Sequence, residues 1–283
     1  MSIAVRRFQA GEAFRAKSYP YALGSHYDSA KECYEAAAKA YLREGLKEEA
    51  LVARSYAVAS LADIEYYIAG NFDSAHRHYL QALKLRSRGT VHLEKRTLDA
   101  YWVDIWFFAG ITAEAKGLAL GQRGEDLSAC ENLTEAIRYY SAGNRMALRA
   151  GAEQEATLFK HSQVALRGQA LVYRGHQILQ SGDFHLALVQ LVRASRLYHL
   201  ALKLNPMWGE SSLSDNYWDC LKELLAVAYS KGMIPNSLVL RCTKCRTATR
   251  PNAKDMVKRS YRCEKCGNIG WFVEIRQTTR NLG

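Results

Sequence analysis

The sequence predicts a mainly α-helical protein, with an antiparallel array of helical hairpins followed by a small three-stranded β domain. Three observations lead to this prediction. Residues 1 to about 232 repeat apolar side chains every three or four positions, and they contain only two of the four prolines, Pro20 and Pro206. Short β-branched and aromatic runs replace this pattern after Gly232. Four of the seven cysteines lie among these runs, in two close pairs.

The helical region is divided by short breaks into about nine predicted helices. Several breaks have a Gly or Asn after a polar last turn, as the C-terminal ends of helices prefer. Because the loops are short, we expect successive helices to pack antiparallel. The breaks are expected at Ser18-Tyr19-Pro20, Glu44-Gly45, Gly70-Asn71, Arg88-Gly89, Arg123-Gly124, Ala150-Gly151, Ser181-Gly182 and Asn205-Pro206.

One signature recurs within the helices: Ala, three residues, Tyr or Leu, two residues, Ala. Small residues on one stripe let a neighbouring helix approach closely, and the larger residue fills the groove between the two. The alternative is an ordinary helical bundle, which also shows such stripes. The four copies are Ala30/Tyr34/Ala37, Ala75/Tyr79/Ala82, Ala129/Leu133/Ala136 and Ala187/Leu191/Ala194.

Two of these copies resemble the tetratricopeptide repeat, in which a Gly ends the first helix and an aromatic residue begins the second. The resemblance implies a solenoid of helical hairpins that binds a protein partner. The signatures here lie 45, 54 and 58 residues apart, whereas the family repeats about every 34 residues. The matching residues are Tyr66, Gly70, Phe72, Ala75, Tyr79 and Ala82 in one copy, and Gly182, Phe184, Ala187, Leu191 and Ala194 in the other.

The C-terminal region reads as three strands, at residues 237–242, 258–263 and 270–277. We place a domain boundary at residues 233–236, where Pro235 follows the last helical pattern. The sequence therefore predicts a helical repeat domain over residues 1–232 and a second domain over residues 233–283.

The two cysteine pairs have the spacing of a metal site. Cys242-x2-Cys245 is followed after 17 residues by Cys263-x2-Cys266, so two tight turns can present four thiolates tetrahedrally to Zn²⁺. Gly267 follows the second pair, where such a turn often needs a positive φ. The spacing and flanking strands resemble the zinc ribbon family. Four protein ligands leave no open coordination position, so the expected zinc is structural.

Most of the net charge of +11 belongs to this region. Residues 231–283 carry 12 basic and 3 acidic side chains, and the rest of the chain carries 27 and 25. Basic side chains with interleaved aromatics such as Trp271 and Phe272 are typical of nucleic-acid binding. The alternatives are a solvated basic surface and aromatics that pack in the ribbon core. The predicted nucleic-acid contacts are Arg246, Arg250, Lys254, Lys258 and Arg259, with Lys244, Arg262 and Lys265 beside the ligands.

Residues 212–276 resemble, more narrowly, the zinc-ribbon protein subunit of ribonuclease P. The shared pattern is a helix ending near Tyr229, then Ile234-Pro235, Leu238, Arg241-Cys242 and a second cysteine pair followed by Gly. That family has helices before its ribbon and contacts RNA, so the resemblance favours RNA over DNA. This chain has a shorter stretch between its cysteine pairs and a large helical domain that the family lacks.

The remaining features favour a binding protein over an enzyme. The sequence has no phosphate loop, dinucleotide fingerprint or zinc-protease helix motif. The most apolar stretch, residues 100–111, is too short for a membrane span, and no secretory signal is evident. We therefore expect a cytoplasmic, reducing environment. Trp102, Trp106, Phe107 and Phe108 could supply a homodimer face, although core packing is the commoner use of such aromatics.

These observations predict a non-enzymatic adaptor. Its ribbon would bind RNA or a ribonucleoprotein, and its helical repeats would bind a protein partner. The alternative is a protein-only scaffold whose ribbon docks on an acidic protein surface.

Overall fold

The computed structural model describes residues 2–18, 24–89, 95–204, 238–242, 244–249, 263–267 and 271–275. It divides into two compact units, Met1–Leu166 and Arg167–Gly283, which we describe separately. The division falls inside one helix. The domain boundary predicted at residues 233–236 lies outside the described residues and stays a prediction.

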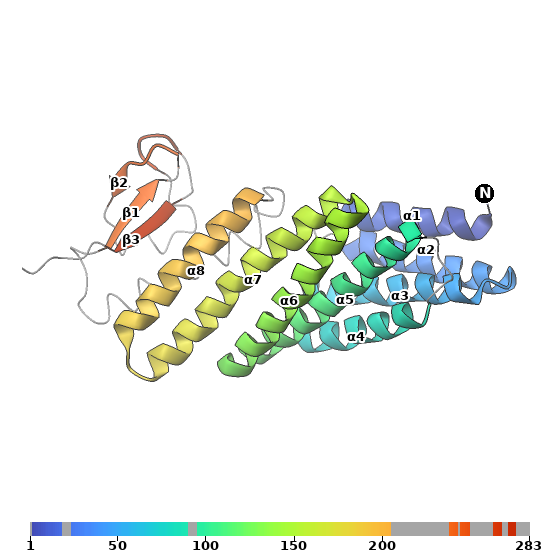
Figure 1. The fold of residues 1–283 in the computed structure, drawn as a ribbon, viewed down its shortest axis with the longest axis horizontal. Coiled ribbons are helices and arrows are strands. Elements are labelled where there is room, and N and C mark those ends of the chain that lie inside the picture. Colours follow the sequence, from blue (N-terminus) through green and yellow to red (C-terminus); the bar gives the residue numbers. More distant parts are fainter. Residues whose placement is uncertain are drawn as a thin grey trace, which may run out of the picture. The chain divides into compact units, whose positions relative to one another are not determined.

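The described residues are mainly helical, as predicted (Figure 1). Within the first unit each helix from α1 to α6 packs against the next one along the chain. A short π-helical stretch, η1 (Glu65–Ala69), continues α3. The helices are α1 (Ile3–Ser18), α2 (Gly24–Arg43), α3 (Lys47–Ile64), α4 (Phe72–Arg88), α5 (Lys95–Gln122), α6 (Asp126–Ala150), α7 (Glu153–Gln180) and α8 (Phe184–Leu204). The ninth predicted helix lies outside the described residues.

The helices end where the sequence predicts. A glycine with positive φ follows or nearly follows five of the helical segments, at Gly45, Gly70, Gly124, Gly151 and Gly182. At the break after Gly70, the side chain of Asn71 accepts a hydrogen bond from the backbone amide of Ser74 and so caps α4. Gly70 supplies the left-handed residue that ends the preceding helix, and Asn71 begins the next one.

The four signature copies form the packing seams of the array. Each copy lies on the second helix of a hairpin, on α2, α4, α6 and α8. All twelve signature residues have 0% of their surface exposed. The predicted role of these residues in close helix packing is therefore confirmed, while their relation to the tetratricopeptide repeat stays a prediction.

In the last two hairpins, the first helix carries a glycine where a large side chain of the second helix packs against it. A Cβ atom added to Gly117 would lie 2.7 Å from the Leu133 side chain, and one added to Gly110 would lie 2.3 Å from the ring of Tyr140. The same two contacts recur 58 residues later, where Gly175 meets Leu191 and Gly168 meets Tyr198. Equivalent contacts therefore join α5 to α6 in one hairpin and α7 to α8 in the other.

Buried tyrosines also connect the two helices of each hairpin. In each hairpin a tyrosine of the second helix, at most 2% exposed, donates its hydroxyl to a polar side chain of the first helix. Such a bond satisfies a hydroxyl that would otherwise be buried without a partner. The pairs are Tyr34 with Glu12, Tyr79 with Asp63 at 2.7 Å, Tyr140 with Glu114 at 2.6 Å, and Tyr198 with Gln169 at 2.6 Å.

Further bonds tie successive hairpins of the first unit together. Arg15 pairs with the buried Asp63 at 3.0 Å. Tyr56 and Arg86 both donate to Asp104, at 2.7 Å and 2.9 Å. The Tyr66 hydroxyl donates to Glu114 at 2.5 Å. The bonds of Arg15, Tyr56 and Tyr66 each span 48 residues of sequence, so they reach from one hairpin to the next.

The aromatic run of α5 divides between core and surface. Phe108 is 1% exposed and Phe107 packs against the core clusters, so core packing accounts for both. Trp102 is 38% exposed and stacks on Trp106. The predicted dimer face therefore reduces to the two tryptophans and stays a prediction. In the part of the chain that the structure describes, no helix is long and apolar enough to cross a membrane.

Three short strands lie among the described C-terminal residues. They are β1 (Leu238–Cys242), β2 (Ala248–Thr249) and β3 (Trp271–Ile275), ordered β2-β1-β3 with both neighbours of β1 antiparallel. The first and third match predicted strands, and β2 was not predicted. The strand predicted at residues 258–263 lies outside the described residues except for Cys263.

Candidate metal centre

The first cysteine pair is formed by the end of β1 and the turn that follows. Cys242 is the last residue of β1, and its carbonyl accepts a hydrogen bond from the amide of Arg246 at 3.0 Å. The amide of Cys242 in turn donates to the carbonyl of Thr247 at 3.0 Å. Arg246 adopts a positive φ of 60°, and it is the one non-glycine residue of the described chain that does so. The turn thus curls Cys245 back towards Cys242.

The second cysteine pair repeats this turn. The carbonyl of Cys263 accepts from the amide of Gly267 at 2.7 Å, and Gly267 has a φ of 68°. Gly267 directly follows Cys266, just as Arg246 directly follows Cys245. The positive φ predicted at Gly267 is confirmed. The same conformation at Arg246 was not predicted, because an arginine gives no sequence signal for it.

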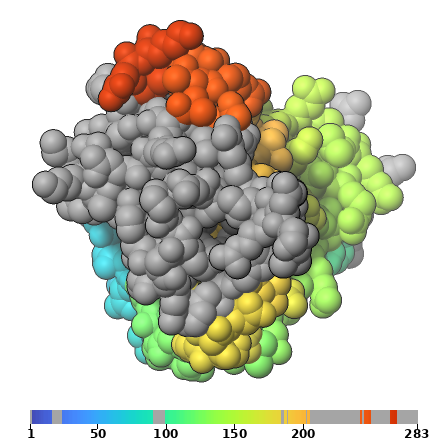
Figure 2. Space-filling model, turned by 90° about the vertical axis from the view of Figure 1, so that its left-hand side faces the viewer, coloured from blue at the N-terminus to red at the C-terminus, as the bar shows by residue number. Residues whose placement is uncertain are grey.

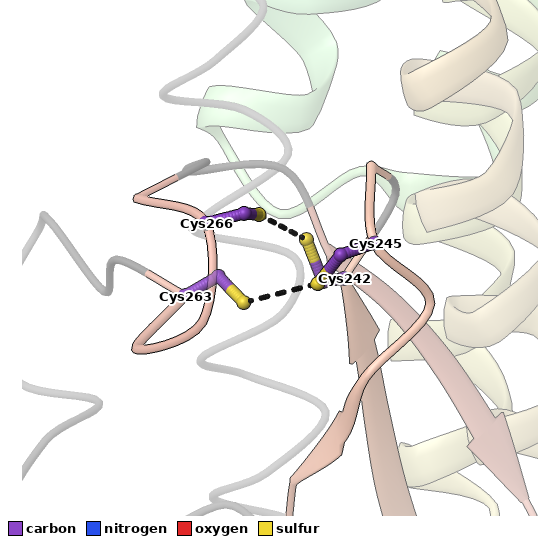
Figure 3. A group of neighbouring side chains, drawn as sticks. All are labelled: Cys242, Cys245, Cys263 and Cys266. Atoms are coloured by element: carbon purple, nitrogen blue, oxygen red, sulfur yellow. Dashed lines mark hydrogen bonds between the residues drawn. The ribbon is translucent and has the colours of Figure 1, made fainter.

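The two turns bring four sulfur atoms together (Figure 3). The Sγ atoms of Cys242 and Cys266 lie 3.5 Å apart, as do those of Cys245 and Cys263, and all four lie within 4.8 Å of one another. Sulfurs placed tetrahedrally at about 2.3 Å from a zinc ion would be about 3.8 Å apart. A disulfide needs about 2.05 Å, so no disulfide joins these four cysteines. Their geometry fits one metal ion.

The surroundings of Cys245 favour its thiolate. Cys242 and Cys263 are buried, at 0% and 2% exposure, and the other two cysteines are half-buried. The Sγ atom of Cys245 lies 3.1 Å from the hydroxyl of Thr247. Hydrogen bonding to Thr247 lowers the pKa of Cys245 to about 6. The thiolate is the form that binds a metal, so this residue is prepared to act as a ligand.

The structure places one of the five predicted nucleic-acid contacts. Arg246 is exposed beside the first cysteine pair, whereas Arg250, Lys254, Lys258 and Arg259 lie outside the described residues. Lys244 and Lys265 are also exposed, and each directly precedes the second cysteine of its pair. The described C-terminal residues, orange and red in Figure 2, reach the molecular surface. The two turns therefore present basic side chains outward and sulfurs inward.

The four-cysteine cluster stands apart from the other metal-binding residue types. Among the residues that the structure describes, it is the one group of three or more Cys, His, Asp or Glu side chains arranged to share an ion. Cys33 and Cys130 are single, half-buried thiols in α2 and α6. His161 is buried at 1% exposure in α7, and the ring of His76 lies against the carbonyl of Thr112 at 3.0 Å.

Neither a protein-family model nor a curated protein matches the chain. The metal centre therefore rests on its own residues and their geometry.

Proposed function

We propose that the chain is a non-enzymatic adaptor with a structural zinc site. Cys242, Cys245, Cys263 and Cys266 would hold Zn²⁺ in a zinc ribbon, whose basic surface would bind RNA or a ribonucleoprotein. The helical hairpins, arranged as a solenoid similar to tetratricopeptide repeats, would bind a protein partner. The observation that carries the proposal is the pair of matching turns, with four sulfurs inside and Lys244, Arg246 and Lys265 outside.

Zinc is favoured among metals by the donor set. Four thiolates in a closed tetrahedral arrangement are typical of structural zinc, because no coordination position remains for water or substrate. Zinc binding would also supply folding free energy that so short a segment cannot gain from a core. When bound, the ion would link the two turns.

RNA binding is supported by where the positive charges lie. Lys244 and Lys265 occupy the same position in the two turns, and both are exposed. Arg246 adds a guanidinium group, which can bind a phosphate with two hydrogen bonds. Residues 231–283 carry twelve basic and three acidic side chains. A zinc ion held by four thiolates would add two negative charges, so the region would still have a positive net charge. The surface would therefore attract a polyanion.

Binding of labelled hairpin RNA and duplex DNA to the full-length protein tests the proposal. We expect log affinity to fall linearly with log salt, with a slope of about 0.9 for each duplex phosphate contacted or about 0.7 for each single-stranded one. A variant carrying Lys244→Ala, Arg246→Gly and Lys265→Ala should bind RNA about tenfold or more weakly and with a shallower slope. A matched control is Arg138→Ala with Arg145→Ala, two exposed arginines of α6.

The same experiment separates the proposal from its alternative. If RNA and DNA both fail to bind at low salt, or if the triple variant binds as well as the control, the ribbon does not contact nucleic acid. Its basic side chains would then fit an acidic protein surface, as in a protein-only scaffold.

A further inference from the structure

The arginines of the α7–α8 hairpin differ from those that bridge helices in the first unit. Arg15 and Arg86 lie within 3.0 Å of the carboxylates of Asp63 and Asp104. Arg167, Arg174 and Arg193 are exposed, and within the described ranges of the chain no carboxylate forms an ion pair with any of them. Among the described residues, their charge is therefore not used to hold helices together.

The local charge balance is strongly positive. Residues 167–204 carry five basic side chains and a single acidic one, Asp183. Asp183 lies at the start of α8, where its carboxylate accepts a hydrogen bond from the amide of Leu186 at 3.0 Å. The helical region is close to neutral as a whole, so this local excess of four positive charges belongs to residues 167–204; Glu153, Glu155 and Lys160 reduce it to three over the full α7–α8 hairpin. The basic residues are Arg167, Arg174, Arg193, Arg196 and Lys203.

The contacts between α7 and α8 put three of these arginines on one side of the hairpin. Gly168 meets Tyr198 and Gly175 meets Leu191, so the helices are antiparallel and Arg174 is level with Arg193. Arg167 and Arg174 each directly precede one of the contact glycines. One position along a helix turns a side chain by about 100°. In an antiparallel pair, the residues that directly precede the contact residues of each helix therefore lie on the same side of the pair. Arg193 directly precedes the buried Ala194 and so shares that side.

Leucines accompany these arginines along the two helices. Leu171 and Leu197 follow Arg167 and Arg193 by four residues, so each leucine lies on the same helix face as its arginine. Both leucines are half-buried. Leu200, three residues further along α8, is 45% exposed and level with Arg167. We call this surface the arginine–leucine face: Arg167, Leu171, Arg174, Arg193, Leu197 and Leu200. The α7–α8 hairpin, yellow near its turn, reaches the surface in Figure 2.

We propose that the arginine–leucine face binds an acidic amphipathic helix of a partner protein. An amphipathic helix lays apolar side chains at intervals of three and four onto such leucines, and carboxylates along its edges pair with the flanking arginines. This inference deepens the protein-partner half of the proposed function and rests on it. It does not depend on RNA binding by the ribbon.

Two other occupants fit the face less well. A nucleic-acid backbone would pair with the arginines but would leave the leucines in water, because it offers them no apolar surface. A second copy of the chain docked through the same face would place arginine against arginine, which is repulsive. An acidic amphipathic helix satisfies both the charges and the leucines.

Selection from a displayed library of random peptides of about 18 residues, or five helical turns, tests the proposal on the full-length protein. We expect the enriched peptides to be acidic, with leucine-like residues three and four apart. Their affinity should fall about tenfold or more with Arg174→Glu combined with Arg193→Glu, and also with Leu200→Glu. A peptide with its glutamates changed to lysine should bind the charge-reversed protein better than the original protein.

Matched controls keep the result interpretable. Arg138→Glu combined with Arg145→Glu reverses two exposed arginines spaced seven apart on α6, as Arg167 and Arg174 are on α7, and should leave peptide binding unchanged. Circular dichroism checks that every variant stays folded. The triple variant of the ribbon should also bind the peptides normally, so a failure of RNA binding is distinguished from a failure here.

Two results would overturn the proposal. One is enrichment of peptides that are not acidic or that ignore the reversal of Arg174 and Arg193. The other is that the protein binds a duplex RNA of about 20 base pairs, and that reversal of Arg174 and Arg193 abolishes RNA binding while the peptides still bind. In that case the face would serve nucleic acid.

Discussion

The helical hairpins and the four-cysteine centre are held together by opposite means. Each hairpin is joined by many small contacts: alanines at 0% exposure, a buried tyrosine hydroxyl bonded to the opposite helix and, in every hairpin except α3–α4, a glycine beneath a large side chain. The cysteine centre depends on four sulfur atoms from two short turns. Loss of one contact should therefore lower the stability of a hairpin only by the share of that contact, whereas loss of one sulfur should abolish the candidate metal centre.

The largest effect is expected from Cys245→Ser. Removing one thiolate should cost most of the metal-linked folding free energy, which is on the order of 10 kcal/mol in comparable zinc peptides. Metal analysis should find about one zinc per chain in the wild type and little in the variant, with the helical circular dichroism signal retained. Cys33→Ser, which changes a single thiol of α2, is the control and should keep its zinc. Full zinc content in Cys245→Ser would contradict the site.

A smaller but clear effect is expected from Gly110→Ala. The added methyl group would lie 2.3 Å from the ring of Tyr140, so either the ring or the helix must move. Overpacking of this kind costs about 1–3 kcal/mol. The matched change is Gly168→Ala, whose methyl group would lie 3.2 Å from Tyr198 and should cost less. Chemical denaturation measures the free energy of unfolding of both variants. Equal losses of stability would show that the distance between the glycine and the tyrosine ring does not determine the cost.

A pH-dependent effect is expected from Glu114→Gln. Burial raises the pKa of Glu114 above its ordinary value of 4.5, although hydrogen bonds from Tyr140 and Tyr66 act to lower it. The folded state therefore holds this proton more tightly than the unfolded state, and the stabilisation is lost as pH rises through the raised pKa. We expect the free energy of unfolding of the wild type, relative to Glu114→Gln, to fall as pH rises from about 4 to 7. A constant difference would contradict the raised pKa.

The smallest effect, with the opposite sign, is expected from Arg246→Gly. A positive φ costs an arginine about 1–2 kcal/mol, while glycine adds about 0.5–1 kcal/mol of entropy to the unfolded chain. The zinc-loaded variant should therefore unfold at a slightly higher denaturant concentration. Lys244→Gly, at a neighbouring position without positive φ, should not be stabilised. Equal changes in the two variants would argue against strain at Arg246.

Much of the fold could be predicted because its determinants are local. The breaks at Gly70 and Gly182 depend on a glycine that accepts positive φ, and the signature around Tyr79 depends on spacing within one helix. The cysteine pairs of the metal centre were predicted for the same reason, since each pair closes its own turn.

The missed features depend on residues far apart in the sequence. The hydrogen bond from Tyr66 to Glu114 spans 48 residues, and no sequence pattern near either residue predicts it. The common 48-residue span of three such bonds is a signal that a search for paired polar residues at a fixed interval could have found. Arg246 is a different case, because its positive φ accompanies a hydrogen bond from its amide to the carbonyl of Cys242, and an arginine gives no sequence signal for that turn.

The recurrence of the glycine contacts after 58 residues has a consequence for how such a chain can change. Gly110 and Gly117 with their partners, and Gly168 and Gly175 with theirs, specify the same joint twice. A joint that occupies so few positions leaves most of the outer surface of each hairpin free to vary. One hairpin can therefore acquire new recognition chemistry while the other does not, because each is held together by its own copy of the joint.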